Sequence, residues 1–190
     1  MEKNEMKYND FIDKETLNIE YKKFTFNIAG LPIDIKQAEY YCNNNIFEFN
    51  TYVINNIYKY FECFLLKNVC AFMNSQINGD FYIGVNDLGF IEGIPYLGIL
   101  PIELITKKMY EILFTYLKFK SNNEDNNEIN LKEIIKINFI NIKLPEKPTE
   151  TIHPEYNRYL KKKRNIQNNI IIILMKLQIG DLNIILYLKN

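Results

Sequence analysis

The sequence predicts an α+β fold in which a mixed or antiparallel sheet packs against two main helices. Apolar residues alternate with polar ones in short segments such as 17–22 and 81–85, a pattern typical of half-buried strands. They recur every three or four residues in 52–73 and again after Pro101, which is typical of amphipathic helices. A chain of 190 residues has the length of one ordinary domain, and no segment repeats at a fixed period.

The domain is expected to cover residues 13–190, after a polar and frayed start at 1–12. Within it we distinguish a core motif at 15–95, an acidic loop at 121–130 and a basic C-terminal part at 151–190. The first strand should bury Leu17, Ile19 and Tyr21 and turn Asn18, Glu20 and Lys22 to its polar face. The long helix at 52–73 has a wide apolar stripe, made of Ile54, Ile57, Tyr58, Phe61, Phe64, Leu65, Val69 and Phe72.

Turn signals separate the following elements. Asn78-Gly79 should form the turn before the strand at 81–85, with glycine supplying a backbone conformation that most residues avoid. Asp87-Leu88-Gly89 supplies the next turn, and a returning strand should begin at Phe90-Ile91. The second helix should bury Leu104, Met109, Ile112, Leu113 and Leu117. A strand is expected around 135–142, and Gly180-Asp181 indicates a hairpin between 170–177 and 182–188.

Composition narrows the class of protein. The chain is 47% hydrophobic, enough for a core, and its many Asn, Ile and Lys residues suggest an A+T-rich genome. With three cysteines and a single histidine, a Cys/His zinc site is not expected. The longest apolar run, 170–175, is far shorter than a membrane span needs, and the polar start lacks a secretory signal. These features favour a soluble cytoplasmic protein.

The charge is zero overall but unevenly distributed. From Thr151 onward seven basic residues face two acidic ones, so this part carries +5 and the first 150 residues carry −5. A cluster of Arg158, Lys161, Lys162, Lys163 and Arg164 lies close to Tyr156 and Tyr159. Basic residues interleaved with aromatics suit a phosphate backbone and exposed bases. A solvated, charged helix face is an equally good interpretation. Lys22 is a further candidate phosphate contact.

Residues 69–93, VCAFMNSQINGDFYIGVNDLGFIEG, resemble the hallmark of Schlafen/AlbA-type (Schlafen AlbA_2) domains. In that family a helix ends in A-F-x-N-[ST], a glycine-containing turn follows, and a strand ends in I-G-V-[DN]-D. The family's upstream E-x-x-x-x-E-[FY]-K element is matched by Glu15, Glu20, Tyr21 and Lys22. The usual Gly-Gly turn is replaced here by Asn78-Gly79-Asp80. Gly84, in mid-strand, should mark the close approach of another backbone or a ligand.

The resemblance implies a catalytic centre of three carboxylates, for which the matching residues here are Glu15, Glu20 and Asp87. Three converging carboxylates would require a divalent cation, Mg²⁺ or Mn²⁺, which could activate water for strand cleavage. Glu15 is an odd number of residues from Glu20, so it must curl in from a turn that Asp13-Lys14 could form. The alternatives are a solvated strand residue for Glu20, a surface charge for Glu15 and a turn former for Asp87.

The function implied is that of a metal-dependent endoribonuclease, or an RNA-binding protein, acting on structured RNA such as transfer RNA. The alternative is a catalytically silent nucleic-acid-binding module, or a viral antagonist of host Schlafen or nucleic-acid pathways. No ATP is expected, because the phosphate-binding G-x-x-x-x-G-K-[ST] motif is missing. Short members of the family and the A+T-rich bias suggest a viral protein of the host cytoplasm. Since 190 residues form about one lobe of an animal Schlafen core, cleavage would call for a homodimer or a partner subunit.

Overall fold

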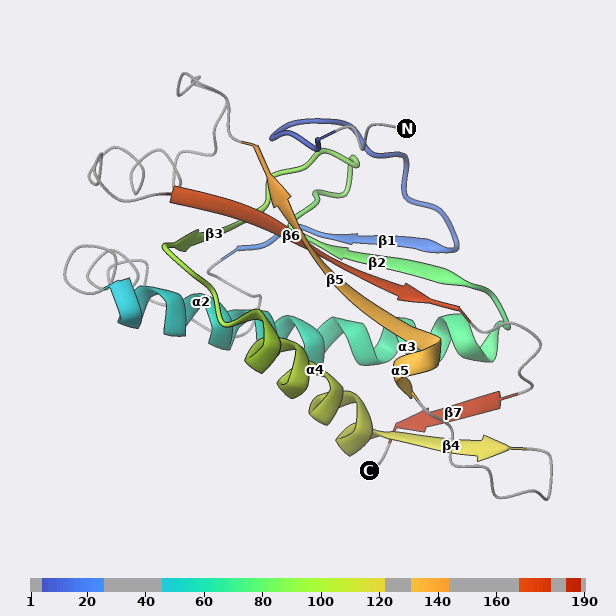
Figure 1. The fold of residues 1–190 in the computed structure, drawn as a ribbon. Coiled ribbons are helices and arrows are strands. Elements are labelled where there is room, and N and C mark those ends of the chain that lie inside the picture. Colours follow the sequence, from blue (N-terminus) through green and yellow to red (C-terminus); the bar gives the residue numbers. More distant parts are fainter. Residues whose placement is uncertain (1–4, 26–45, 122–130, 144–167, 179–183, 189–190) are drawn as a thin grey trace.

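A computed structural model describes residues 5–25, 46–121, 131–143, 168–178 and 184–188 (Figure 1). The long helix is built from α2 (Ile46–Tyr60), the π-helical turn η1 (Phe61–Leu65) and α3 (Leu66–Asn74), which follow one another without a break. The other helices are α4 (Ile102–Tyr116) and the short α5 (Leu131–Ile134). The α+β class predicted from the sequence is therefore confirmed.

The main sheet has five strands: β1 (Ile19–Lys22), β2 (Gly79–Ile83), β3 (Ile94–Leu97), β5 (Ile135–Ile142) and β6 (Asn168–Leu177). Strand β1 runs parallel to β2, whereas β2, β3 and β5 are all antiparallel to β6. Strand β5 follows almost the whole of β6 on one side, so β2 and β3 must share its other side, one after the other. The sheet is mixed, and β6 is its centre.

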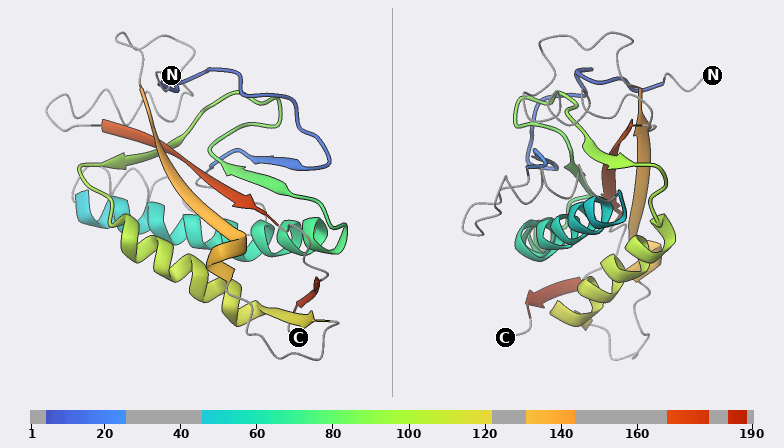
Figure 2. Two further views of the ribbon diagram at one scale, coloured as in Figure 1. Left: turned by 45° about the vertical axis from the view of Figure 1, so that its right-hand side comes forward. Right: turned by 90° about the vertical axis from the view of Figure 1, so that its left-hand side faces the viewer.

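Helices cover one face of this sheet, and the N-terminal segment covers part of the other (Figure 2). The larger core cluster joins the long helix and α4 to the helix-facing side chains of the strands, among them Phe81, Ile83, Ile173 and Met175. A smaller cluster on the opposite face contains Tyr21, Tyr82, Ile172 and Leu174, and the N-terminal Met6, Tyr8 and Ile12 pack against it. Burial on both faces explains why β6 is apolar without interruption from Ile170 to Met175.

The N-terminus differs from the expectation of fraying at residues 5–12. Tyr8 N–H donates to Lys143 O at 3.0 Å, and Ile12 N–H donates to Gly89 O at 2.9 Å. Apolar side chains every few residues allow this segment to dock on the sheet although most of its residues are polar. Residues 1–4 lie outside the described part.

Two strand assignments from the sequence are wrong. The hairpin between 170–177 and 182–188 does not form, because β7 (Ile184–Leu188) pairs with β4 (Leu117–Ser121) in a separate two-stranded sheet. The expected returning strand at Phe90-Ile91 is reduced to isolated bridges, and regular pairing resumes only in β3. In both cases the apolar pattern identified an extended segment but not its partner.

Individual burial assignments also need correction. Leu17, expected in the core, is 92% exposed because it lies in the turn that precedes β1. Leu104 is 62% exposed, and Ile105 takes the core position next to it on α4. Gly79 belongs to β2 rather than to the turn, where Gln76 adopts the left-handed conformation (φ 53°). Glycine is required at 79 because the ring of Phe72 fills the space of a Cβ atom.

Candidate functional site

The parallel pairing of β1 and β2 determines where Glu20 and Lys22 lie. Glu20 is in register with Phe81, and Lys22 with Ile83. Residues in register share a face of the sheet, so both charged side chains lie on the helix-facing side at its β1 edge. Each side chain is about three-quarters buried, and the two form an ion pair. The Lys22 ammonium also lies 5.7 Å from the centre of the Phe64 ring, a cation–π contact with η1.

Glu15 approaches β1 from its outer edge. The chain reverses between Thr16 and Ile19, whose backbones exchange hydrogen bonds at 3.3 and 3.2 Å. The reversal therefore lies after Glu15, not at Asp13-Lys14 as expected. It brings the Glu15 carboxylate to Tyr21, whose N–H donates to Oε1 at 3.2 Å. Glu15 thus caps the free edge of β1.

Asp87 lies beyond the end of β2, in the connection to β3. The neighbouring Asn86 organises this turn: its Oδ1 accepts hydrogen bonds from Leu88 N at 3.0 Å and Phe90 N at 3.1 Å. The Gly89 N–H closes the turn on Asn86 O at 2.8 Å. Asp87 is exposed at the tip of this turn, in agreement with the interpretation of Asp87 as a turn former.

The three carboxylates do not provide a divalent-cation site as they lie. Glu15 is bound to the backbone N–H of Tyr21, Glu20 is paired with Lys22, and Asp87 is exposed beyond the end of β2. Throughout the described ranges, no group of three or more His, Cys, Asp or Glu side chains is placed to hold a metal ion. The donor set expected for Mg²⁺ or Mn²⁺ is therefore not assembled, and we derive no chemical step from it.

A second polar cluster near the ends of β1 and β2 was not found from the sequence. The Glu92 side chain is only 15% exposed, and its Oε2 lies 2.9 Å from Lys23 Nζ. Asn86 Nδ2 donates to Glu92 Oε1 at 2.9 Å, so this carboxylate joins the residue that follows β1 to Asn86 in the β2–β3 connection. Gly84 makes the approach possible: Gly93 N–H donates to its carbonyl at 2.7 Å, and a Cβ at 84 would lie 3.0 Å from Gly93 Cα. The backbone approach expected at Gly84 is thus present.

The predicted basic site is described only in part. Arg158, Lys161, Lys162, Lys163 and Arg164 lie outside the described residues. Lys176, from the same basic part of the chain, forms an ion pair with Asp80 at 2.9 Å.

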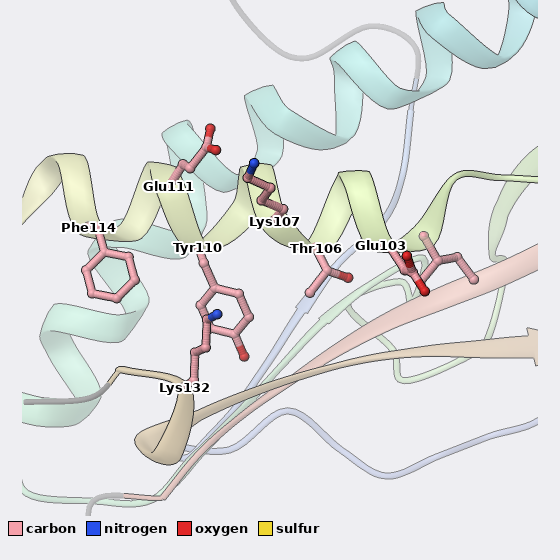
Figure 3. Close-up of a pocket in the computed structure, with 8 residues that line it drawn as sticks. Glu103, Thr106, Lys107, Tyr110, Glu111, Phe114 and Lys132 are labelled. Carbon is pink, nitrogen blue, oxygen red and sulfur yellow. The ribbon is translucent and has the colours of Figure 1, made fainter.

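A groove lies between α4 and α5 (Figure 3). Its volume is about 460 Å³. The described side chains that line it come from α4 and α5: Ile102, Glu103, Thr106, Lys107, Tyr110, Glu111, Phe114 and Lys132. Two glutamates and two lysines give this lining no net charge, which does not favour a polyanion.

Comparison with known proteins gives one result. No curated protein matches the chain. The family model described as "Schlafen, AlbA_2" matches residues 33–178, well over half of the chain. The match includes Asn86 and Asp87 but begins after β1, so Glu15, Glu20 and Lys22 lie before it. The mixed sheet and the close approach of the Gly84 and Gly93 backbones agree with this match, and we conclude that the chain belongs to the Schlafen AlbA_2 family.

Proposed function

We propose that this protein binds nucleic acid, structured RNA such as transfer RNA in particular, and does not cleave it through a three-carboxylate metal centre. Membership of the Schlafen AlbA_2 family supports a nucleic-acid-related role. The ion pair of Glu20 with Lys22 is the observation that argues against cleavage through a three-carboxylate metal centre. A carboxylate held by an adjacent ammonium is already neutralised, so it has less need of a cation.

The β1 edge offers a contact surface for RNA. This contact requires the Lys22 ammonium, which is ion-paired with Glu20 and about three-quarters buried, to exchange that carboxylate for an RNA phosphate. The half-buried Phe64 ring beside it suits a stacked base. The basic residues Arg158, Lys161, Lys162, Lys163 and Arg164 are proposed to extend this contact, on their sequence alone. Binding of this kind depends mainly on phosphate charge and should weaken steeply as salt rises.

Binding is tested by fluorescence anisotropy with labelled transfer RNA over a series of salt concentrations. We expect Lys22→Gln to weaken binding several-fold and to reduce the salt dependence by about one phosphate contact. Lys108→Gln is the matched control, because Lys108 forms an ion pair with Glu111 on the exposed face of α4. This variant should bind RNA as wild type does. Equal loss in both variants, or no binding by wild type, would contradict the proposal.

Cleavage is tested by incubating the same RNA with wild type, Glu20→Ala and Asp87→Ala in Mn²⁺ or Mg²⁺. We expect intact RNA in all three samples. Cleavage by wild type that both substitutions abolish would show that the carboxylates gather when RNA binds, and the metal-dependent endoribonuclease would then be the correct function.

A further inference from the structure

Three aromatic rings follow one another from the core to the surface near the end of β1. Phe24 is buried and stacks on Tyr60, with ring centroids 5.4 Å apart and an interplanar angle of 26°. Tyr60 is also buried, and its ring centroid lies 5.6 Å from that of Phe64 in η1. Phe64 is half-buried, so it is the outermost of the three. We call Phe24, Tyr60 and Phe64 the aromatic row.

Hydrogen bonds hold the middle of the aromatic row in place. The Tyr60 hydroxyl donates to Lys23 O at 2.8 Å, and it accepts from Thr25 N at 2.8 Å. Both partners come directly after β1, so the row is joined to the sheet as well as to the long helix. An aromatic ring that is already held in position loses little conformational freedom when a ligand stacks on it.

Lys22 contacts the outer end of the aromatic row. Its ammonium lies 5.7 Å from the centre of the Phe64 ring and forms an ion pair with Glu20. The Lys22 side chain is 25% exposed, so water reaches it. A lysine stem is flexible, and the ammonium can therefore move away from the ring without any movement of the backbone.

A second ammonium lies on the same side of the long helix. Lys67 comes three residues after Phe64, and residues three apart are neighbours on a helix surface. Lys67 is exposed, and it forms no ion pair with the residues that the structure describes. Glu62, two residues before Phe64, faces another side of the helix. Around the ring, Lys22 and Lys67 therefore outweigh Glu20 by one positive charge.

We propose that Phe64 is the stacking site for one unpaired base of a bound RNA. The Lys22 ammonium leaves the ring for a phosphate of the same strand, and the base takes its place over Phe64. This inference rests on the proposed binding of RNA and names the part of the RNA that the β1 edge takes. Every base has a π-face, so the site does not select a sequence.

The position of Phe64 favours an unpaired base over a duplex. Lys22 lies on the helix-facing side of β1 and contacts Phe64 from there, so the ring lies between the edge of the sheet and the long helix. Bases within a duplex are already paired and stacked. An unpaired base in a loop, a bulge or a chain end can turn outward and reach an aromatic side chain. The two ammonium groups beside the ring favour a nucleotide over an uncharged aromatic ligand.

The first test uses tryptophan fluorescence. The chain contains no tryptophan, so Phe64→Trp carries a single one at the proposed site. It is titrated with oligouridylate, a strand without stable pairing, and with a blunt RNA duplex of the same length. We expect the single strand to quench the emission and the duplex to leave it nearly unchanged, because only a stacked base contacts the indole. Phe114→Trp, in the groove between α4 and α5, is the matched control and should respond to neither.

The second test measures affinity by fluorescence anisotropy with labelled oligouridylate. Phe64→Leu keeps an apolar side chain but removes the ring, and should weaken binding roughly five- to hundredfold. Phe114→Leu is the matched control at a 46% exposed position and should bind as wild type does. Circular dichroism of both variants checks their fold, and the tryptophan measurement does not depend on either of them.

The outcomes separate this inference from the proposed function. If oligouridylate binds to Phe64→Trp without quenching it, or if the duplex quenches it equally, the stacking site is wrong while RNA binding stands. Equal affinities of Phe64→Leu and Phe114→Leu for oligouridylate also overturn the stacking site. If wild type binds neither transfer RNA nor oligouridylate, both proposals are overturned.

Discussion

At the scale of single residues, the phenol of Tyr82 is strongly perturbed by its surroundings. Its ring lies in the smaller core cluster, 5.4 Å from the ring of Tyr21, and it is 7% exposed. Burial, and then the charge of the Asp80 carboxylate, raise the pKa of Tyr82 from 10.0 to about 12. The neutral phenol is thus favoured in the folded protein.

This shift predicts how stability depends on pH. Since the pKa of Tyr82 is higher in the folded state, its contribution is fully present below about pH 10 and is lost as the pH rises through about 12. Phenylalanine cannot ionise, so the free energy of unfolding of Tyr82→Phe should fall less steeply over this range than that of wild type. Denaturant unfolding at several pH values measures both slopes. Equal slopes for wild type and Tyr82→Phe between about pH 10 and 12 would contradict the assignment.

The sequence predicted correctly whether a side chain is buried where the periodic pattern of its neighbours along the chain determines its burial. Tyr21, Ile57, Val69 and Met109 are buried as their spacing indicates. Leu17 and Leu104 are not, because a turn before β1 and the rotation of α4 depend on packing with distant segments. The Glu92 cluster has no local signal at all, since Lys23 is 69 residues away from it in sequence.

At the scale of elements, the connection between β2 and β3 holds the N-terminal segment in place. Ile91 N–H donates to Asp10 O at 3.0 Å, and the Phe90 ring lies 5.4 Å from that of Phe11. Gly89 has a φ of 85°, and a Cβ atom at this position would overlap the Asp13 carbonyl oxygen. The tight contact therefore needs glycine for two reasons, conformation and space.

A pair of alanine substitutions separates these reasons. Gly98 also has a positive φ, 66°, but a Cβ atom there would meet nothing within 4 Å. Gly98→Ala should cost only the left-handed conformation, about 1–2 kcal/mol in free energy of unfolding. Gly89→Ala should cost about 1–3 kcal/mol more, because the N-terminal segment must shift. Chemical denaturation of both variants gives the difference, and equal losses would show that the contact with Asp13 is not tight.

Element types were easier to predict from the sequence than their pairing. The periods of the apolar residues identified the long helix, α4, β2 and β5 with roughly correct bounds. They could not show that β7 joins β4, because alternation reports burial and not the identity of the neighbouring strand. The three acidic residues are a similar case: motif order selected them, but their distances depend on turns that the motif does not encode.

At the scale of the whole molecule, the N-terminal segment closes the second face of the sheet. Met6, Tyr8 and Ile12 cover a cluster that includes Tyr82 and Leu174, and Tyr8 also joins the segment to Lys143. The segment lies before residue 33, where the family match begins. Without it, one apolar face would meet water.

Removal of residues 1–14 should therefore lower the thermal midpoint and increase the binding of a hydrophobic dye, because Tyr82 and Leu174 lose their cover. Leu17→Ala, at a 92% exposed position in the turn before β1, is the control and should change neither value. Thermal unfolding and dye fluorescence are measured on both variants. Unchanged stability after the deletion would mean that the segment rests on the sheet without stabilising it.

The central position of β6 has a consequence for the order in which the protein is made. Strands β2, β3 and β5 all leave the ribosome before β6, the strand with which each of them pairs. Pairing between such distant segments is slow, and apolar strands that wait for a partner are exposed to aggregation. Assembly of the sheet therefore waits for synthesis to pass residue 177. A chain that ended before residue 168 would contain every described helix and no centre for its sheet.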